Sequence, residues 1–248
     1  MGTNTVNTVR HSAEFEVDYL RNLTVDVIGL GVTGLRVATE LAGLGVEKLR
    51  LWDHDVIEAH NISNQTPAYG VGDIGRPKVE VLAELLKART GLEAVANQVE
   101  VDGTQRLGQV VFLLTDTTQS RRGIAQKAIR RKIQTKLMIE TRLGVHEHRV
   151  YTINPMNSTE YAGWEQSLPK GDRVVQPSGC GAKTTLGANA SALAGDAVGQ
   201  FIRWLAIQTD RGQLPNGNMD VIEHELLVHK RPHMLMTRMF EASDVLAA

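Results

Sequence analysis

Apolar and polar positions in the first part of the chain follow the pattern of a strand, a helix and a second strand. An apolar run at 24–28 is followed by a glycine-rich turn, an amphipathic stretch that ends near Leu44, and a second apolar run at 49–52. Short apolar runs on either side of an amphipathic helix are typical of parallel strands that are buried on both faces. The pattern therefore predicts a βαβ unit.

The same two periodicities predict that this unit continues into a doubly wound, mostly parallel α/β fold of the Rossmann type. Pro77 is placed to begin a helix with one apolar face, and the continuous run VVFLL predicts a strand buried on both faces. The other predicted elements are a short helix at 13–22, a long functional loop at 56–75, strands at 93–101, 110–114 and 136–140, and a helix at 120–131.

Beyond Arg142 the pattern predicts a smaller mixed or antiparallel C-terminal extension. We expect a strand at 150–153, a long crossover-type loop at 154–187, a helix at 189–208 capped by Asn189, and a final strand at 220–229. The predicted organisation is an N-terminal arm with a short helix (1–22), a nucleotide-binding domain (23–145), a C-terminal part (146–240) and a disordered tail (241–248).

Composition narrows the classes of partner. The 248 residues include 27 Lys and Arg against 28 Asp and Glu, so no overall field attracts nucleic acid or an anionic membrane. A basic cluster at 121–136 has no interleaved aromatic residues, and we interpret it as a solvated helix face. No apolar run reaches the roughly 18 to 20 residues of a membrane span, and the first ten residues lack a signal-peptide core. We expect a cytoplasmic protein that binds neither nucleic acid nor membrane.

The glycine-rich turn predicts a phosphate site. Gly29, Gly31 and Gly34 form a G-x-G-x-x-G motif between the first strand and its helix, where backbone N–H groups and the helix dipole favour an anion. Asp53 ends the second strand and is placed to bind a ribose. Dinucleotide dehydrogenases, methyltransferases and adenylating enzymes all share this arrangement, and Asp53 alone fits NAD equally well.

Two further charged residues point to the same edge of the sheet. Lys78 falls in the first turn of a predicted helix, where a cation opposes the helix dipole, so a ligand phosphate explains it better than helix stability does. Asp116 follows the buried central strand, at the crevice where open α/β sheets bind ligands. The competing interpretation of Asp116 is a helix cap.

Several motifs, in order and at matching spacings, resemble the ThiF/MoeB/HesA family of adenylyltransferases, which are relatives of ubiquitin-activating enzymes. They are Asp53-x-Asp55, Asn61 with Gln65, Gly75-x-Pro77-Lys78, and Thr115-Asp116 with Arg121. The resemblance covers about residues 25–143, and the stretch GCGAKTTLGANASALAGDAVGQFI is similar to the loop and final helix of the family. It implies a homodimer that uses ATP and Mg²⁺ to adenylate the C-terminal carboxylate of a small ubiquitin-like protein or peptide, releasing pyrophosphate.

The resemblance also implies residue roles. Asp53 would hold the ribose, Lys78 would contact phosphate oxygens, and Asp116 would bind Mg²⁺. Asn61 and Gln65 would position phosphates, and Arg121 would hold a loop or a carboxylate. The other expected nucleotide contacts are Gly29, Gly31, Gly34, Asp55, Asn64, Thr117 and Arg10. The simpler interpretations are a surface lysine at 78, a solvated arginine at 121 and turn residues at 61 and 65.

Two positions depart from the family pattern. Asn64 stands where an arginine is usual, and Val32 stands where a glycine is usual. Arg10 is the available counterpart of an arginine that often reaches across the dimer in this family, and we hypothesise that it partly replaces the missing charge. The departures favour, as one alternative, a nucleotide-binding scaffold without catalysis. The other alternative is an NAD(P)-dependent oxidoreductase, which would leave Lys78 and Asp116 without a role.

The single cysteine, Cys180, excludes an intrachain disulfide and a multi-cysteine zinc site, so we expect no zinc. Family members often carry a cysteine before the last helix, and in some it forms a thioester or acyl disulfide with the activated partner. The alternative for Cys180 is a packing role. His224 and His229 have opposite parity on the predicted last strand, so we interpret them as structural.

Overall fold

A computed structural model describes residues 4–65, 68–170 and 187–243. Its centre is an eight-stranded sheet in the order β3-β2-β1-β4-β5-β6-β7-β8. Strands β1 to β5 are parallel, and β6 to β8 are antiparallel. The strand bounds are β1 Thr24–Ile28, β2 Lys48–Trp52, β3 Val95–Asn97, β4 Val110–Leu113, β5 Leu137–Leu143, β6 Glu147–Ile153, β7 Glu225–Lys230 and β8 His233–Arg238. The predicted doubly wound fold with an antiparallel C-terminal extension is therefore confirmed.

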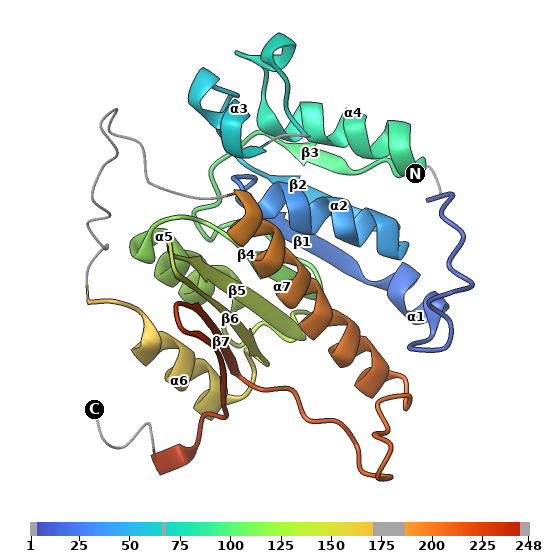
Figure 1. Cartoon of the computed structure of the whole chain (residues 1–248), viewed down its shortest axis with the longest axis vertical. Helices are drawn as coiled ribbons and strands as arrows, with labels where there is room; N and C mark the ends of the chain where they lie inside the picture. Colours follow the sequence, from blue (N-terminus) through green and yellow to red (C-terminus); the bar gives the residue numbers. More distant parts are fainter. Residues whose placement is uncertain (1–3, 66–67, 171–186, 244–248) are drawn as a thin grey trace.

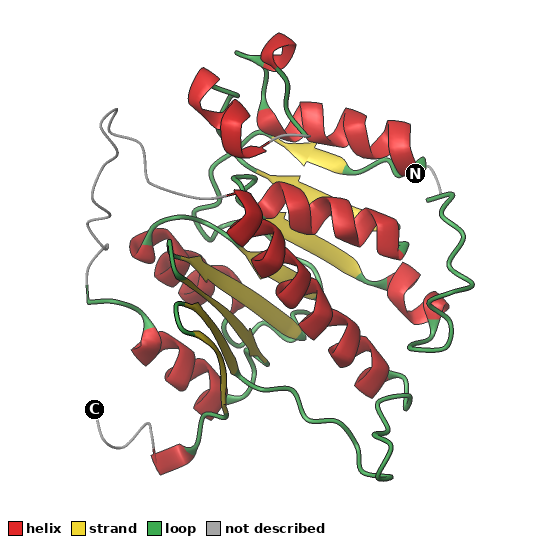
Figure 2. Ribbon diagram, viewed as in Figure 1, coloured by secondary structure: helices red, strands yellow, loops and turns green. Residues whose placement is uncertain are grey.

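Helices cover both faces of the sheet. In Figure 1, α7 crosses the near face diagonally beside α2, and α4 lies on the other side of α2. Figure 2 shows the same layering of helices against strands. The helix bounds are α1 Val17–Asn22, α2 Gly34–Leu44, α3 Ala59–Gln65, α4 Lys78–Thr90, α5 Thr118–Ile124, α6 Ser158–Ser167 and α7 Gly187–Gln208, with short turns η1 Val71–Asp73 and η2 Ala125–Ile129.

Alternation along the strands produces two apolar cores. Val25 and Val27 of β1 pack in one core with residues of α1, α2, α4 and α7. Ile28 of β1 and Val111 of β4 belong to the other core, with residues of α5, η2 and α6. Because successive side chains of a strand point to opposite faces, continuous apolar runs such as VVFL serve both cores at once.

The structure differs from the sequence prediction in the connecting segments. The predicted loop 154–187 contains α6, where Trp164 is fully buried, and residues 171–186 lie outside the described part. The predicted loop 56–75 contains α3 and η1. These elements were missed because they are short and half-polar, so their own sequence gives little helical signal.

Strand and helix ends also differ. The third strand is only Val95–Asn97, and the predicted final strand begins at Glu225 and is followed by a second strand, β8. Asn189 lies inside α7, where its side-chain amide donates to the Val145 carbonyl at 2.7 Å instead of capping the helix. Because the antiparallel strands extend the same sheet, residues 146–240 form no separate sheet of their own in the described part.

Candidate nucleotide site

A cavity of about 500 Å³ opens at the carboxyl ends of β1, β2 and β4. β1 pairs with β2 on one side and β4 on the other, so the connections from β1 and β4 leave in opposite directions along the sheet. Ligands of open α/β sheets bind at this switch point. The cavity has the size typical of small-molecule sites. Its lining includes most of the predicted site residues: Gly29, Gly31, Asp53, Asp55, Asn61, Asn64, Gln65, Lys78, Asp116 and Thr117.

The glycine turn is pressed against the end of β4. Gly29 has φ of +91°, and a Cβ there would lie 2.8 Å from the Leu114 carbonyl oxygen. A Cβ on Gly34 would lie 1.8 Å from the Gly29 carbonyl oxygen. Both positions require glycine for these close approaches. Gly31 instead faces open space within the cavity lining, which leaves room for a ligand at the backbone.

The Asp53 carboxylate is held rigidly by backbone donors. Its Oδ2 accepts from the Leu30 N–H at 2.6 Å and its Oδ1 from the Asp55 N–H at 2.8 Å. Each carboxylate oxygen can accept a second hydrogen bond. Asp53 is therefore oriented and still able to accept from ribose hydroxyls.

Lys78 lies in the first turn of α4, almost fully buried, and is not a surface lysine. Its Nζ donates to Asp55 Oδ2 at 2.7 Å, and both residues line the cavity. Half of the Asp55 side-chain surface is accessible to solvent. A bound phosphate would replace that solvent and share the ammonium donors of Lys78.

Tyr69, which was not singled out from the sequence, packs behind the cavity wall that contains Lys78. Its hydroxyl donates to the Leu30 carbonyl at 3.4 Å and is 3.5 Å from the Lys78 carbonyl. Burial, and secondarily the charge of Asp53, raise the pKa of the Tyr69 hydroxyl. The hydroxyl therefore remains a donor at neutral pH.

Helix α3 forms the opposite wall. Asn61 is buried and its Oδ1 accepts from the Glu58 N–H at 2.9 Å, so it has the turn-stabilising role that was one of its two interpretations. Gln65 is buried, and its Oε1 has no hydrogen-bond partner among the described residues. Buried polar atoms of this kind are normally satisfied by a ligand or water. Gln65 is therefore the residue of α3 that is best placed to contact a ligand.

Asp116 lies at the end of β4 on the cavity wall, exposed to solvent. The N-cap of α5 is Thr117, whose Oγ1 accepts from the Ser120 N–H at 3.1 Å. Thr117, and not Asp116, therefore occupies the N-cap position of α5. One exposed carboxylate beside a phosphate site fits Mg²⁺, which keeps several waters and takes one or two carboxylates together with phosphate oxygens.

Asp53, His54 and Asp55 are a second group with ligand atoms within 4.8 Å of one another. Asp53 is engaged by two backbone N–H groups, and Asp55 is paired with Lys78. These pairings make the group a poorer metal site than the wall around Asp116.

Arg121 lies behind the cavity, not in its lining. Its Nε is 3.1 Å from Oε1 of Glu140, which is fully buried in β5, and its Nη2 donates to the Thr141 carbonyl at 3.2 Å. Glu140 also pairs with Arg142 and accepts from Trp164 Nε1. Arg121 thus joins α5 to β5 and is not a solvated helix residue. Glu140 was not singled out because an acid in a strand pattern gives no sign of its partners.

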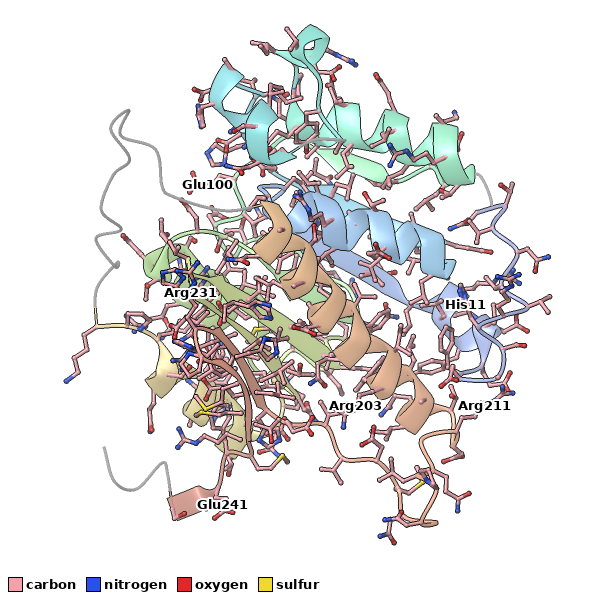
Figure 3. All side chains as sticks on the ribbon, viewed as in Figure 1. His11, Glu100, Arg203, Arg211, Arg231 and Glu241 are labelled. Carbon is pink, nitrogen blue, oxygen red and sulfur yellow. The ribbon has the colours of Figure 1, made fainter. Side chains whose placement is uncertain are left out.

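Among the described residues, Arg10 lies away from the cavity. Arg10 follows Thr8, which packs against Gly45 at the carboxyl end of α2, and the glycine turn is at the other end of that helix. In Figure 3, His11 next to it lies across the molecule from Glu100, which lines the cavity. Cys180 lies outside the described residues.

Comparisons with known proteins agree with the fold and the motifs. The sequence profile of the ThiF family matches residues 7–243. The chain is 33% identical over 89 residues, 36% of its length, to the adenylyltransferase and sulfurtransferase MOCS3 of Caenorhabditis briggsae, of which the match covers 22%. It is 37% identical over 67 residues, 27% of its length, to the molybdopterin-synthase adenylyltransferase of Salmonella typhimurium, of which the match covers 26%.

The matched segments thus span about a quarter of these curated relatives. Among solved structures, E. coli MccB with MccA-N7isoASN has a TM-score of 0.70 at 15% identity, covering 90% of this chain and 66% of that one. PaaA has a TM-score of 0.64 at 18% identity, covering 90% and 74%. These structures share the fold. In the described part of the chain, no helix has the length and apolar character needed to cross a membrane. The profile match, which extends over nearly the whole chain, shows that this protein belongs to the ThiF family.

Proposed function

We propose that the chain is an ATP-dependent adenylyltransferase that activates the C-terminal carboxylate of a small ubiquitin-like protein or peptide. The observation that carries the proposal is the convergence of Gly31, Asp53, Lys78, Gln65 and Asp116 on one cavity. A glycine turn and a ribose-binding acid alone would serve any nucleotide. A buried lysine and an exposed acid beside them supply what a polyphosphate and its metal need.

In the proposed reaction, an oxygen of the substrate carboxylate attacks the α-phosphorus of ATP. The bond between the α-phosphorus and the bridging oxygen to the β-phosphorus breaks, and pyrophosphate leaves with that oxygen. The products are an acyl-adenylate and pyrophosphate. Mg²⁺ held at Asp116 would supply charge neutralisation of the phosphates. Lys78 would stabilise charge that grows on the leaving group.

The walls of the cavity limit where each part of ATP can lie. Asp53, fixed at the end of β2, would accept from the ribose hydroxyls. The apolar side chains of Trp52, Val99 and Val101 line the cavity beyond β2 and would enclose the base. The phosphates would then extend along the glycine turn toward α3 and Lys78.

Pyrophosphate exchange into ATP tests the activity. The protein is incubated with Mg²⁺-ATP, labelled pyrophosphate and a panel of small proteins and peptides that have a free C-terminal carboxylate. The same panel amidated at the C-terminus is the control, because an amide cannot form the acyl-adenylate. We expect label in ATP only with free carboxylates. Equal exchange with amidated substrates, or none with any member, contradicts the proposal.

Nucleotide choice is tested separately by thermal denaturation. We expect Mg²⁺-ATP to raise the melting temperature more than NAD or NADH does, because at equal concentration the ligand with the smaller Kd stabilises the folded state more. A larger shift with NAD would favour an oxidoreductase. A shift with ATP and no exchange would favour a nucleotide-binding scaffold. We further propose that the chain acts as a homodimer and that Cys180 forms a thioester or acyl disulfide with the activated partner.

A further inference from the structure

The described residues that line the cavity carry little positive charge for a polyphosphate. Its described lining contains one lysine, Lys78, against four carboxylates, from Asp53, Asp55, Glu100 and Asp116. Lys78 is itself paired with Asp55. A triphosphate brought to such a lining meets repulsion unless a metal ion and further cations offset it. The most relevant cations are those directly behind the cavity wall.

Arg36 is such a cation. It lies in the first turn of α2, directly after the glycine turn. Its Nη1 donates to the Val32 carbonyl at 2.6 Å, and its Nη2 donates to the Asn64 carbonyl at 3.0 Å. Val32 and Asn64 both line the cavity. The guanidinium group therefore lies between the glycine turn and α3, directly behind two residues that line the cavity.

The position is unfavourable for a cation in the absence of an anion. A positive charge in the first turn of a helix opposes the helix dipole, and α2 has no acidic residue there to compensate. The N-terminus of α7 adds a second positive dipole end, since Arg36 Nη2 is 3.2 Å from the point where a Cβ of Gly187 would lie. Burial lowers the pKa of Arg36. The Arg36 guanidinium, the N-terminus of α2 and the N-terminus of α7 thus lie together on one side of the cavity.

We propose that Arg36 is a positioning residue for the nucleotide phosphates, which supplies from α2 the positive charge that position 64 does not carry. The inference rests on the proposed nucleotide-binding function. Arg36 acts by its charge and by fixing the carbonyls of Val32 and Asn64 so that the glycine turn presents its N–H groups to the phosphates. A further contact, from Nε to Ser191 Oγ at 2.9 Å, ties the group to α7.

The test compares ligands that differ only in phosphate. Dissociation constants of Mg²⁺-ATP and of adenosine are measured by calorimetry for the wild type, Arg36→Gln, Arg36→Lys and Ser191→Ala. The control variant is Arg89→Gln, because Arg89 is an exposed arginine near the far end of α4. We expect Arg36→Gln to weaken ATP binding about tenfold to a hundredfold, as for a lost charge-assisted interaction, and to leave adenosine binding unchanged. Arg36→Lys should recover part of the loss, and Ser191→Ala and Arg89→Gln should bind ATP as the wild type does.

Each other outcome overturns a defined part of the inference. If Arg36→Gln loses affinity equally for ATP and adenosine, Arg36 only holds the structure together, and the proposed role toward phosphate is overturned. A loss in Ser191→Ala as large as that in Arg36→Gln shows that Arg36 acts by holding α7. Unchanged ATP binding in Arg36→Gln overturns the Arg36 proposal alone. A wild type that binds ATP no more tightly than adenosine overturns the proposed function as well.

Discussion

Asp26 is a fully buried carboxylate in the central strand β1, outside the cavity lining. Its Oδ2 accepts from Arg50 Nη2 and from the Gly108 N–H, both at 2.6 Å, and its Oδ1 accepts from Trp52 Nε1 at 2.6 Å. Two of these donors belong to the neighbouring strand β2, and the third belongs to the segment that leads into β4. A buried charge of this kind is tolerated only because all its partners are present.

Replacing Asp26 by alanine should therefore lower the free energy of unfolding by about 3–5 kcal/mol, since it leaves Arg50, Trp52 and the Gly108 N–H without their acceptor. Urea denaturation followed by circular dichroism gives the value. The control is Asp18→Ala, because the Asp18 side chain is 91% exposed; it should change stability by less than about 0.5 kcal/mol. Similar decreases in the free energy of unfolding for both variants would show that the buried hydrogen bonds of Asp26 do not stabilise the protein more than an exposed carboxylate does.

Lys78 is the single residue on which the proposed chemistry depends most. Lys78→Met should reduce pyrophosphate exchange about a hundredfold or more, because a positioned charge on the leaving phosphates is lost. Lys87 lies on the same helix, exposed and paired with Glu93, so Lys87→Met is a matched control that should keep wild-type exchange. Wild-type pyrophosphate exchange in Lys78→Met would show that Lys78 has no part in the chemistry and serves only as the ion-pair partner of Asp55.

At the scale of elements, α7 is joined to the segment that leads into β7 by one arginine. Arg203 Nε and Nη2 donate to the two oxygens of Asp220 at 2.7 Å each, and Nη1 donates to Glu223 at 2.5 Å. Figure 3 places Arg203 on the side of α7 that faces this segment. Parallel hydrogen bonds from one guanidinium to one carboxylate are among the stronger ion pairs.

This pairing makes stability depend on acid pH. The hydrogen bond from Arg203 holds the pKa of Asp220 below its usual range, and Arg203 acts with a backbone contact to lower that of Glu223 against the opposing effect of burial. A lowered folded-state pKa gives stability that is present at neutral pH and is lost as pH falls below about 4, where the unfolded carboxylates protonate.

Arg203→Gln should therefore destabilise the protein by about 1 kcal/mol at pH 7, a modest value because all three side chains are partly exposed. The difference from the wild type should shrink as the pH is lowered from 7 to 3. Urea denaturation across that range measures it. A difference that is constant with pH would show that Arg203 stabilises α7 by packing alone.

At the scale of the whole molecule, the N-terminal arm is fastened to the body and is not a loose tail in the described residues. The Asn4 side chain donates to the Ala42 and Val46 carbonyls at 2.8 and 3.1 Å, and Arg211 contacts Ser12 and Glu16. These contacts hold Arg10 at the carboxyl end of α2. An 11-residue helix is about 16 Å long, so Arg10 cannot reach the cavity of its own chain without releasing the arm.

If Arg10 completes the site, it must therefore do so in a second copy of the chain. We expect Arg10→Ala and Lys78→Met to be inactive in pyrophosphate exchange when each is assayed alone. An equal mixture that has exchanged subunits should recover about a quarter of the wild-type activity, because each mixed dimer keeps one intact site. Recovery cannot occur if Arg10 acts within its own chain. Full activity of Arg10→Ala alone would show that Arg10 has no role in exchange.

The local pattern of apolar residues predicted a segment correctly where that segment is buried along its whole length. The runs at 24–28 and 110–114 were correctly predicted as buried strands because their apolar side chains enter one of two apolar cores. It failed for α6, whose ten residues are half-polar. Trp164 lies in the stretch that was predicted as a loop, and its burial is explained by a core that it shares with residues of β5 and β6 and by the Glu140 acceptor.

The sequence by itself determined the fold class and the residues of the glycine turn, Asp53, Lys78 and Asp116, because strand order and motif spacing bring the carboxyl ends of parallel strands to one edge. Tertiary structure decided which charged side chains line the cavity and which lie behind it. Arg121, expected at the site, pairs with Glu140 behind it, and Arg36, which belongs to no motif, lies between the glycine turn and α3. The physical reason is that a long side chain is placed by partners that are distant in sequence, and such partners leave no periodic signal.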